Sequence, residues 1–504
     1  MPEPLKGDLV IRGGLVADPA TPLAEPRDLL LRDGIIVSIG ASGMTVPEGT
    51  PAFDATGLLL HPGLVNGHTH SHGFLGRGIG DRWTLELLLA ASPWVSGGRT
   101  FADKALSATI GAAEMALKGC TAAFDMMNEL PLPTEEGLDA VAAAYDRVGI
   151  RAVVAPMVAD RTLYQAIPPL AEALPPELRA EVAALALAPW GDTFAALERV
   201  ARGWRWSGRD IAFGIGPTIP THCDDAFLRA CARLAAEHGV PLTMHVAESK
   251  VQAVIGARTY GRSLVRHLDA LGLIGPRFVA AHAIWLDDGD RAILAGRGAA
   301  IIHNPSSNMK LGNGMFAMRE ALDAGVTVGL GTDTCSCGDN LNMYEAMRAA
   351  SLLSKVQGPD PARWVSAEEA YRAATEGSAR ALGIPGIGRI AEGAKADIVF
   401  LDLSHPTWMP HRWTVNQLVH AEDATAVRHV AVGGRFIVRD GRLTTVDLDA
   451  LRGEAEEHRQ RHERDTRQQR ALFERLAPIV ARVGPALAAE PLPVRRYLAD
   501  AGSF

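Results

Sequence analysis

Residues 64–72 read Leu-Val-Asn-Gly-His-Thr-His-Ser-His, and the interpretation of the whole chain starts from this stretch. His68 and His70 are one residue apart and follow the apolar run Leu58–Val65. At the end of a β-strand alternate side chains point the same way, so both imidazoles can reach one metal ion. A His-x-His pair alone suits two ordinary loop histidines equally well. The metal hypothesis therefore depends on further ligands elsewhere in the chain.

The composition is that of a large globular protein. A chain of 504 residues exceeds what one core organises, so we expect a catalytic domain and at least one smaller unit. A formal net charge of -8, spread along the chain, argues against nucleic acid as the main partner. Five cysteines, an odd number, suit reduced thiols and predict a cytoplasmic location. The sequence shows no signal-peptide pattern and no apolar run of membrane-spanning length, so we expect no membrane partner.

Apolar runs alternate with Ala- and Leu-rich helical stretches through the middle of the chain, as in a parallel α/β architecture. Eight runs are predicted to be strands: residues 63–70, 120–127, 151–158, 211–218, 241–248, 278–284, 299–305 and 327–333. Eight parallel strands with helices between them specify a (β/α)8 TIM barrel, whose chemistry lies at the carboxyl ends of the strands. His68 and His70 lie at such an end.

Two segments near the ends of the chain share a different residue pattern. Short β-type runs separated by glycine turns fill residues 1–60 and return in 386–447, so we expect both to build one composite β-sandwich domain around the barrel of 61–385. Residues 448–504 begin with a run of mixed charges, typical of a solvated helix, and are predicted to form a helical C-terminal extension.

Further metal-ligand residue types stand at other predicted strand ends. His245 ends the fifth strand, His282 the sixth and Asp333 the eighth. A single strand-end histidine is usually a packed residue, but several strands delivering such side chains to one face predict a metal site. Nitrogen ligands with one carboxylate and an open position suit zinc, with iron as the alternative.

These residues and their order resemble the amidohydrolase superfamily. Within it, the chain is similar to the branch of S-adenosylhomocysteine and methylthioadenosine deaminases, guanine and cytosine deaminases, and triazine hydrolases. The matching motifs are His-Pro-Gly-Leu-Val-Asn-Gly-His-Thr-His at 61–70, His-Asn-Pro-Ser-Ser-Asn-Met-Lys-Leu-Gly-Asn-Gly at 303–314, Gly-Thr-Asp at 331–333, and the segments 374–383 and 388–399. The resemblance implies the same barrel and composite sandwich.

The resemblance also implies roles for the strand-end residues. His68, His70, His245 and Asp333 look like the metal ligands, and His282 looks like the histidine beside the nucleophilic water. Glu248 stands where the acid/base glutamate of the deaminases stands, although a salt-bridged carboxylate at a helix start is the alternative.

One metal ion is expected rather than two. A two-metal site of the hydantoinase kind needs a carboxylated lysine at the end of the fourth strand, and the sequence has no lysine between Lys118 and Lys250.

The predicted function is hydrolytic deamination of an amino-substituted nitrogen heterocycle, with release of ammonia. Glu248 would supply the protons and Asp333 would accept one from the attacking water. The alternative is hydrolysis of a carbon–halogen, amide or urea bond in a small, nitrogen-containing, xenobiotic-type compound. A scaffold protein without chemistry is disfavoured because every expected ligand is present. The resemblance also suggests a homo-oligomer, a dimer or higher.

Three residues are candidates for contact with the small-molecule substrate. Trp94 could stack on a flat ring, or pack the barrel mouth. Thr218 stands where purine-nucleoside deaminases of the family carry a substrate-binding histidine, and residues 92–96 lack the acidic side chain that would grip a ribose, so a ribosyl substrate is disfavoured. His303 could bind substrate or brace the loop that follows it.

Overall fold

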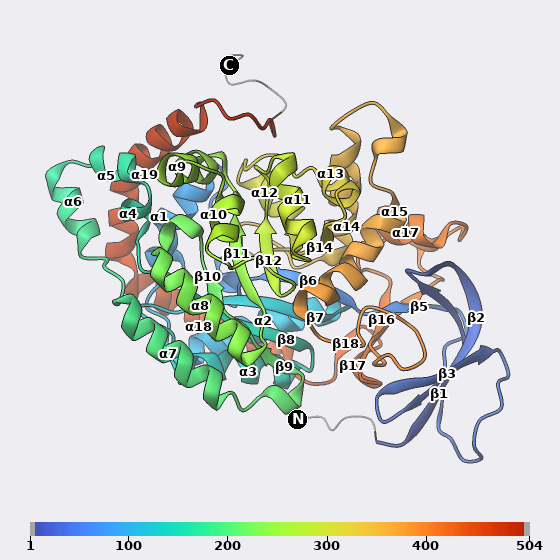
Figure 1. Cartoon of the computed structure of the whole chain (residues 1–504). Helices are drawn as coiled ribbons and strands as arrows, with labels where there is room; N and C mark the ends of the chain where they lie inside the picture. Colours follow the sequence, from blue (N-terminus) through green and yellow to red (C-terminus); the bar gives the residue numbers. More distant parts are fainter. Residues whose placement is uncertain (1–5, 498–504) are drawn as a thin grey trace.

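The computed structural model describes residues 6–497. The N-terminal strands and the strands between residues 398 and 443 form one sheet at one side of the molecule, and the α/β region lies beside it (Figure 1). The predicted unit boundaries at residues 1 and 504 lie outside the described residues.

The strands of the composite sheet come from both ends of the chain. The order is β18-β17-β16-β15-β5-β1-β2-β3, with β4 pairing with β1. The junction is the antiparallel pair β5–β15, in which Phe400 lies opposite Leu60. The bounds are β1 (Asp8–Asp18), β2 (Thr21–Arg32), β3 (Ile35–Ala41), β4 (Ala52–Asp54), β5 (Leu58–Pro62), β15 (Ile398–Asp402), β16 (Val427–Val432), β17 (Arg435–Arg439) and β18 (Arg442–Leu443).

Parallel strands occupy all eight predicted positions in the middle of the chain. They form two curved parallel sheets, β10-β8-β7-β6 with β9 beside β8, and β11-β12-β13-β14. The strands are β6 (Leu64–Thr69), β7 (Cys120–Asn128), β8 (Arg151–Val158), β9 (Ile211–Phe213), β10 (Gly216–Pro217), β11 (Leu242–Val246), β12 (Phe278–His282), β13 (Ala300–His303) and β14 (Thr327–Leu330).

The fourth strand is not continuous, contrary to the prediction for 211–218. It divides into β9 and β10 on either side of Gly214, where a Cβ atom would stand 3.0 Å from Val153 and 3.2 Å from Ala155. A side chain at this position would contact the side chains of β8 tightly, and glycine avoids that contact.

Hydrogen bonds join the two parallel sheets at both seams. Ile215 and Leu242 form an isolated parallel bridge, and the backbone N–H of His245 donates to the carbonyl of Thr218 over 2.9 Å. On the other side, the N–H of Asp333 donates to the carbonyl of His68 over 3.0 Å. The carboxyl ends of both sheets therefore converge on one face.

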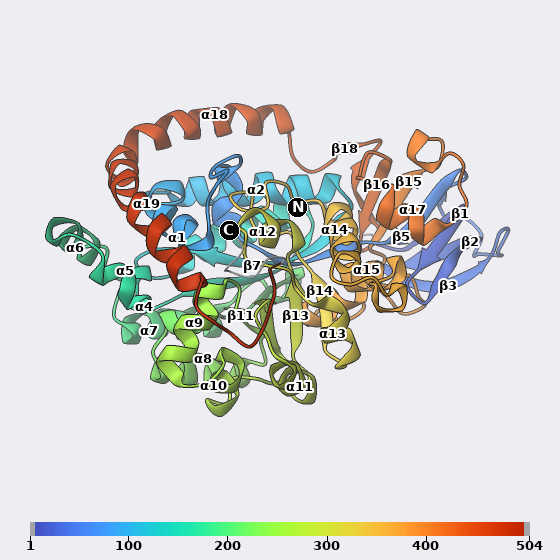
Figure 2. The ribbon, with the colours of Figure 1, turned by 90° about the horizontal axis from the view of Figure 1, so that it is seen from above.

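Helices connect the strands and cover their outer side (Figures 1 and 2). Local sequence sets their ends: Thr100 and Asp103 form a capping box before α2, and Gly149 closes α3 with φ 95°. The main helices are α1 (Leu85–Val95), α2 (Phe101–Leu117), α3 (Glu135–Val148), α7 (Trp190–Gly203), α8 (Asp225–His238), α9 (Lys250–Tyr260), α10 (Leu264–Ala270), α11 (Asp288–Gly296), α12 (Pro305–Lys310), α13 (Met318–Asp323), α14 (Met343–Lys355), α15 (Ala367–Arg372), α16 (Ser378–Leu382) and α17 (Thr414–His420).

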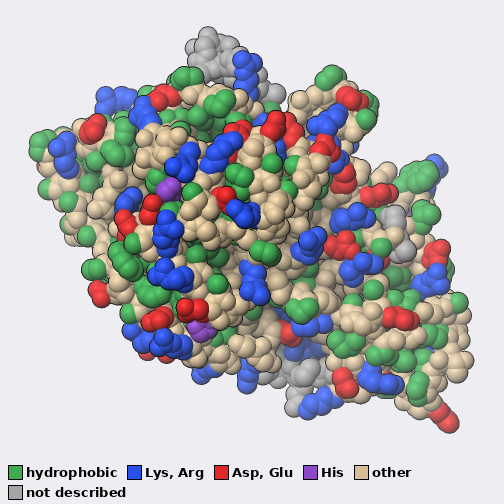
Figure 3. Space-filling model, in the orientation of Figure 1, with side chains coloured by type: hydrophobic (Ala, Val, Ile, Leu, Met, Phe, Trp, Pro, Cys, Tyr) green, Lys and Arg blue, Asp and Glu red, His purple; other side chains and the backbone are tan. Residues whose placement is uncertain are grey.

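Two long helices follow the composite sheet. Helix α18 (Leu448–Asp465) arches along the edge of the molecule with most of its side chains exposed, and α19 (Arg467–Ala488) returns against α1 (Figure 2). The side chains that α19 buries are Phe473, Leu476, Val480 and Leu487. Among the described helices, none has the length and apolarity needed to span a bilayer. On the face seen in Figure 3, basic and acidic side chains are interspersed.

Candidate metal centre

Four strand ends deliver one buried polar cluster. His68 and His70 come from β6, His245 from β11, His282 from β12, and Asp333 from the turn after β14. His282 and Asp333 have left-handed backbone, with φ of 64° and 58°. Such strained conformations in non-glycine residues concentrate at functional sites, because the surrounding fold must hold them in place.

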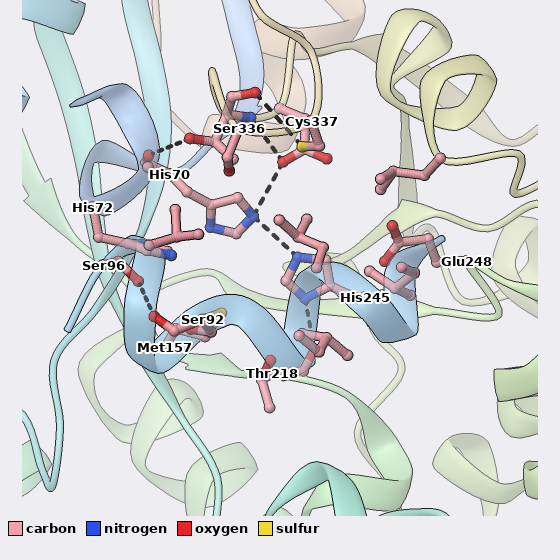
Figure 4. Close-up of a pocket in the computed structure, with 18 of the residues that line it drawn as sticks. His70, His72, Ser92, Ser96, Met157, Thr218, His245, Glu248, Ser336 and Cys337 are labelled. Carbon is pink, nitrogen blue, oxygen red and sulfur yellow. Dashed lines mark hydrogen bonds and ion pairs between the residues drawn. The ribbon is translucent and has the colours of Figure 1, made fainter. Parts of the chain in front are cut away.

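The ligand-type atoms of these side chains converge. The Nε2 atoms of His70 and His245 lie 3.1 Å apart. One oxygen of Asp333, Oδ1, lies 3.3 Å from Nε2 of His70 and 3.8 Å from Nε2 of His68. Figure 4 shows the imidazoles of His70 and His245 pointing toward one another in the pocket.

Backbone carbonyls fix the tautomers of two of the histidines. Nδ1 of His70 lies 2.7 Å from the carbonyl oxygen of Met126, and Nδ1 of His245 lies 2.8 Å from that of Thr218. A carbonyl oxygen only accepts, so each Nδ1 carries the proton and each Nε2 presents a lone pair. Two lone pairs facing each other at 3.1 Å repel unless a cation lies between them. This is the ligand geometry of metal-binding histidines.

His68 gives independent support for a cation at this place. It is 1% exposed, and neither of its ring nitrogens has a hydrogen-bond partner. Burial, together with the neighbouring His70, lowers its pKa well below the ordinary value, which keeps the ring neutral. Buried polar atoms without partners are costly, and a metal ion at the cluster would satisfy Nε2, the ring nitrogen that faces Asp333. The residues present therefore fit a site with nitrogen ligands and one carboxylate.

Asp333 remains ionised in this environment. Burial alone would raise its pKa, but the hydrogen bond from Ser307 opposes that rise, and the pKa lies below its usual range. The hydroxyl of Ser307 donates to Oδ2 over 2.7 Å, and the backbone N–H of Thr334 donates to Oδ1 over 2.9 Å. The carboxylate is therefore charged and held in one orientation.

Glu248 and His282 lie beside the cluster. Nε2 of His282 is 3.7 Å from Oε2 of Glu248 and 3.6 Å from Oδ2 of Asp333. Burial raises the pKa of Glu248 well above its ordinary value, and the carboxyls of Asp333 and Glu86 raise it further. A buried carboxyl of this kind holds a proton that it can donate. The amide of Asn313 donates to Oε1 of Glu248 over 3.0 Å.

Sequence reasoning missed the asparagines that hold these groups. Nδ1 of His282 lies 2.8 Å from Oδ1 of Asn308, and Nδ2 of Asn308 lies 3.3 Å from Nδ1 of His303. His303 thus contacts Asn308, with its ring against Phe316. The signal was the run of Asn and Ser in residues 304–313, whose amides suit the support of buried histidines.

Of the three substrate-contact candidates, His303 lies against Asn308 and Phe316, and the other two lie in different places. Thr218 lines the pocket at the cluster, together with His72, His245 and Glu248. Trp94 does not line this pocket. Its ring packs 5.7 Å from that of Phe473 in α19, with the guanidinium of Arg470 over its face.

The pocket at the cluster is apolar on the side away from the imidazoles. The apolar wall consists of Leu85, Leu88, Leu89, Val95, Met157, Ile219 and Leu311. A second, larger cavity shares Leu89, Ser92, Met157 and Thr218 with it, so the pocket continues outward beyond the cluster. His72 lines the inner pocket, and its Nδ1 accepts the backbone N–H of Asn128 over 3.1 Å, which leaves Nε2 to carry the proton.

The fold and the cluster define a metal-site hydrolase with parallel α/β architecture. The model of the amidohydrolase family matches residues 59–437, and the chain belongs to this family. It is accordingly a hydrolase that acts on carbon–nitrogen bonds other than peptide bonds.

Similar proteins are deaminases and triazine-type hydrolases. A 5'-deoxyadenosine deaminase from Methanopyrus kandleri is 33% identical over 87% of this chain and 95% of its own. The structure of an adenosine deaminase from Xanthomonas campestris with bound zinc is 27% identical, covers 92% of this chain and 100% of its own, and has a TM-score of 0.80. The zinc complex of atrazine chlorohydrolase from Arthrobacter aurescens is 25% identical, with 89% and 99% coverage and a TM-score of 0.80.

Proposed function

We propose that the protein deaminates an amino-substituted nitrogen heterocycle by hydrolysis, using one divalent metal ion. The observation that carries this proposal is the position of Glu248, a buried carboxyl of raised pKa, 3.7 Å from His282 at the edge of the cluster. A proton donor next to a water-activating site suits the departure of ammonia, which requires protonation of its nitrogen.

His68, His70, His245 and Asp333 are the proposed ligands of the ion. Three imidazole nitrogens and a carboxylate favour zinc, and iron is the alternative. The groups of metal-capable side chains found among the described residues overlap at this one place, and Thr218 rather than a lysine ends the fourth strand. One ion is therefore proposed.

The ion, when bound, lowers the pKa of a coordinated water toward neutrality. Asp333 accepts the proton of the attacking water, and His282 orients that water and stabilises the charge that develops on its oxygen. Glu248 protonates a ring nitrogen, takes up the second proton of the attacking water and passes it to the departing amine; the proton held by Asp333 then returns to Glu248. The apolar wall of the pocket holds the flat ring and excludes bulk water.

The proposed substrate class is an adenine-type amino heterocycle. The relatives named as 5'-deoxyadenosine and adenosine deaminases support it. Thr218 in place of a histidine argues against recognition of a ribose by the usual contact. The second cavity next to Thr218 has room for a substituent on the ring.

Hydrolysis of a carbon–halogen bond is the second candidate. The similarity to atrazine chlorohydrolase favours it, and the same activated water would act with chloride as the leaving group. Glu248 then protonates the ring nitrogen only.

Product analysis separates the two candidates. Purified protein is incubated with adenine, adenosine, 5'-deoxyadenosine, cytosine, guanine, aminotriazines and chlorotriazines, and ammonia and chloride are both measured. The proposal predicts ammonia release from at least one aminopurine. Chloride release without ammonia from any substrate would replace it by the second candidate.

The architecture proposed for this function is a closed (β/α)8 barrel with a β-sandwich beside it. The hydrogen bonds at both seams of the parallel sheets support closure. We propose the unit boundaries 61–385 for the barrel, 1–60 with 386–447 for the sandwich and 448–504 for the extension. A homo-oligomer remains part of the proposal, and light scattering tests it.

A further inference from the structure

The segment after α19, residues 491–497, crosses the face of the molecule where the strand ends meet, and we call it the C-terminal strap (Figure 2). It lies beyond residue 437, where the family match ends. Leu492 and Val494 are partly buried against the main core, and both line a cavity together with Trp285. The strap is thus docked on the barrel rather than extended into solvent.

Arg496 attaches the strap to two loops of this face. Its Nε donates to the carbonyl of Ile284 over 3.0 Å, and its Nη2 donates to the carbonyl of Leu286 over 3.1 Å and to Glu320 over 3.2 Å. Its own carbonyl accepts the N–H of Met315 over 2.9 Å. The side chain of Arg496 is 12% exposed, so these bonds are formed largely out of water.

Hydrogen bonds connect the loops that the strap contacts with Glu248. The indole N–H of Trp285 donates to the carbonyl of Asn313 over 2.8 Å, and the amide of Asn313 donates to Glu248 over 3.0 Å. The ring of Tyr497 packs edge-on against Trp285, with 5.0 Å between centroids.

The backbone at Gly314 lies close to the strap. Gly314 has φ +112°, and a Cβ atom there would stand 3.2 Å from the Cβ and the carbonyl oxygen of Arg496 and 3.3 Å from Trp285. The positive φ favours glycine here, and the strap lies close to the backbone of this loop.

We infer that the C-terminal strap is part of the active-site support, and that Arg496 is a positioning residue that acts on Glu248 through Trp285 and Asn313. This inference rests on the proposed role of Glu248 as proton donor. A carboxyl that moves protons needs its orientation fixed to within a fraction of an ångström, and the strap supplies the outermost layer of that support.

The test compares Arg496→Ala with Arg482→Ala, which removes an exposed arginine of α19. The inference predicts that Arg496→Ala lowers kcat by about tenfold or more with KM changed less than about twofold, while the metal content stays that of the wild type. Asn313→Ala should show the same pattern, and the double variant should lose no more than the worse single variant, because both act in one chain of contacts. Arg482→Ala should behave as the wild type.

Hydrogen–deuterium exchange gives a readout that needs no substrate. Peptides covering residues 311–317 should exchange faster in Arg496→Ala than in Arg482→Ala, with peptides of β7 unchanged. Exchange at 311–317 equal in both variants, or additive losses of kcat, would overturn the inference. If the wild type deaminates nothing, the proposed function fails and the exchange experiment still decides whether the strap holds this loop. Should Arg496→Ala not fold, Arg496→Lys takes its place, with a smaller effect in the same direction.

Discussion

The proposed deamination depends on proton transfer by Glu248. Glu248→Gln preserves the shape of the side chain and its contact with Asn313 but cannot move a proton, so we expect kcat to fall by about 10²–10⁴-fold. The metal content should remain unchanged, because Glu248 is not a proposed ligand. Steady-state ammonia release and metal analysis of the same sample check both statements. Full activity in Glu248→Gln would remove the proton-transfer role.

Asn308 fixes the orientation of His282, so its removal should lower the catalytic rate. Since Oδ1 of Asn308 accepts from Nδ1 of His282, Asn308→Ala is expected to lower kcat by about 10–100-fold with the metal retained. Asn308→Asp keeps an acceptor oxygen and should recover most of the loss. Equal activity of the alanine and aspartate variants would contradict this role.

Residue types and spacing predicted the cluster but not its supports. His68, His70, His245, His282 and Asp333 stand at strand ends in the sequence, so period and position were sufficient to bring them together. The carbonyls of Met126 and Thr218, which fix two tautomers, carry no side-chain signal. The sequence around Trp94 suits both stacking on a substrate and packing within the fold. Its packing on Phe473 could not be predicted, because that residue lies in a helix nearly four hundred residues further along the chain.

At the scale of elements, a buried ion pair joins β8, the third parallel strand along the chain, to the composite sheet. Arg151 at the start of β8 contacts Asp397, just before β15, through two bonds of 2.8 and 2.9 Å. Both side chains are at most 3% exposed. Asp397→Ala leaves the guanidinium without its main partner and should lower the free energy of unfolding by about 3–5 kcal/mol.

A surface pair on the same sheet is the control. Arg428 and Asp440 lie 2.8 Å apart but are 49% and 58% exposed, so Asp440→Ala should cost less than about 1 kcal/mol. Denaturant unfolding of both variants makes the comparison. A cost for Asp397→Ala no larger than that for Asp440→Ala would show that the pair does not hold the two units together.

Strand prediction succeeded where the chain is buried on both faces. The residues of β6 are all buried, and so are the first eight residues of β7, so these strands read as continuous apolar runs. The break between β9 and β10 could not be predicted, because the apolar run 211–218 reads as one strand and the closeness of Gly214 to the side chains of β8 has no sequence signal. The C-terminal strap could not be predicted either, since a seven-residue segment with two prolines and two arginines has no periodic pattern.

For the whole molecule, buried neutral histidines predict how stability depends on pH. Burial lowers the pKa of His61 and of His222 to about 4. In the unfolded chain each would titrate near 6.5, so between about pH 4 and 6.5 the unfolded state binds more protons and stability falls as the pH falls. Each group contributes a slope of up to about 1.4 kcal/mol per pH unit in this window.

Substitution of one histidine measures its contribution to the pH dependence of stability. His222→Gln should reduce the slope of unfolding free energy against pH between 4.5 and 6 by about 1 kcal/mol per unit, and leave the slope above pH 7 unchanged. Urea unfolding at a series of pH values measures it. An unchanged slope would mean that His222 is protonated in the folded protein.

We propose above all that side chains from three strand ends, those of β6, β11 and β14, bind one metal ion. Metal analysis of purified protein, wild type beside His245→Ala, tests it most directly. We expect one equivalent of a divalent ion, zinc first, per wild-type chain, and loss of nearly all of it in a folded His245→Ala variant. Wild-type protein that is folded and binds no metal when zinc is supplied, or a His245→Ala variant that binds it as tightly as the wild type, would contradict the account.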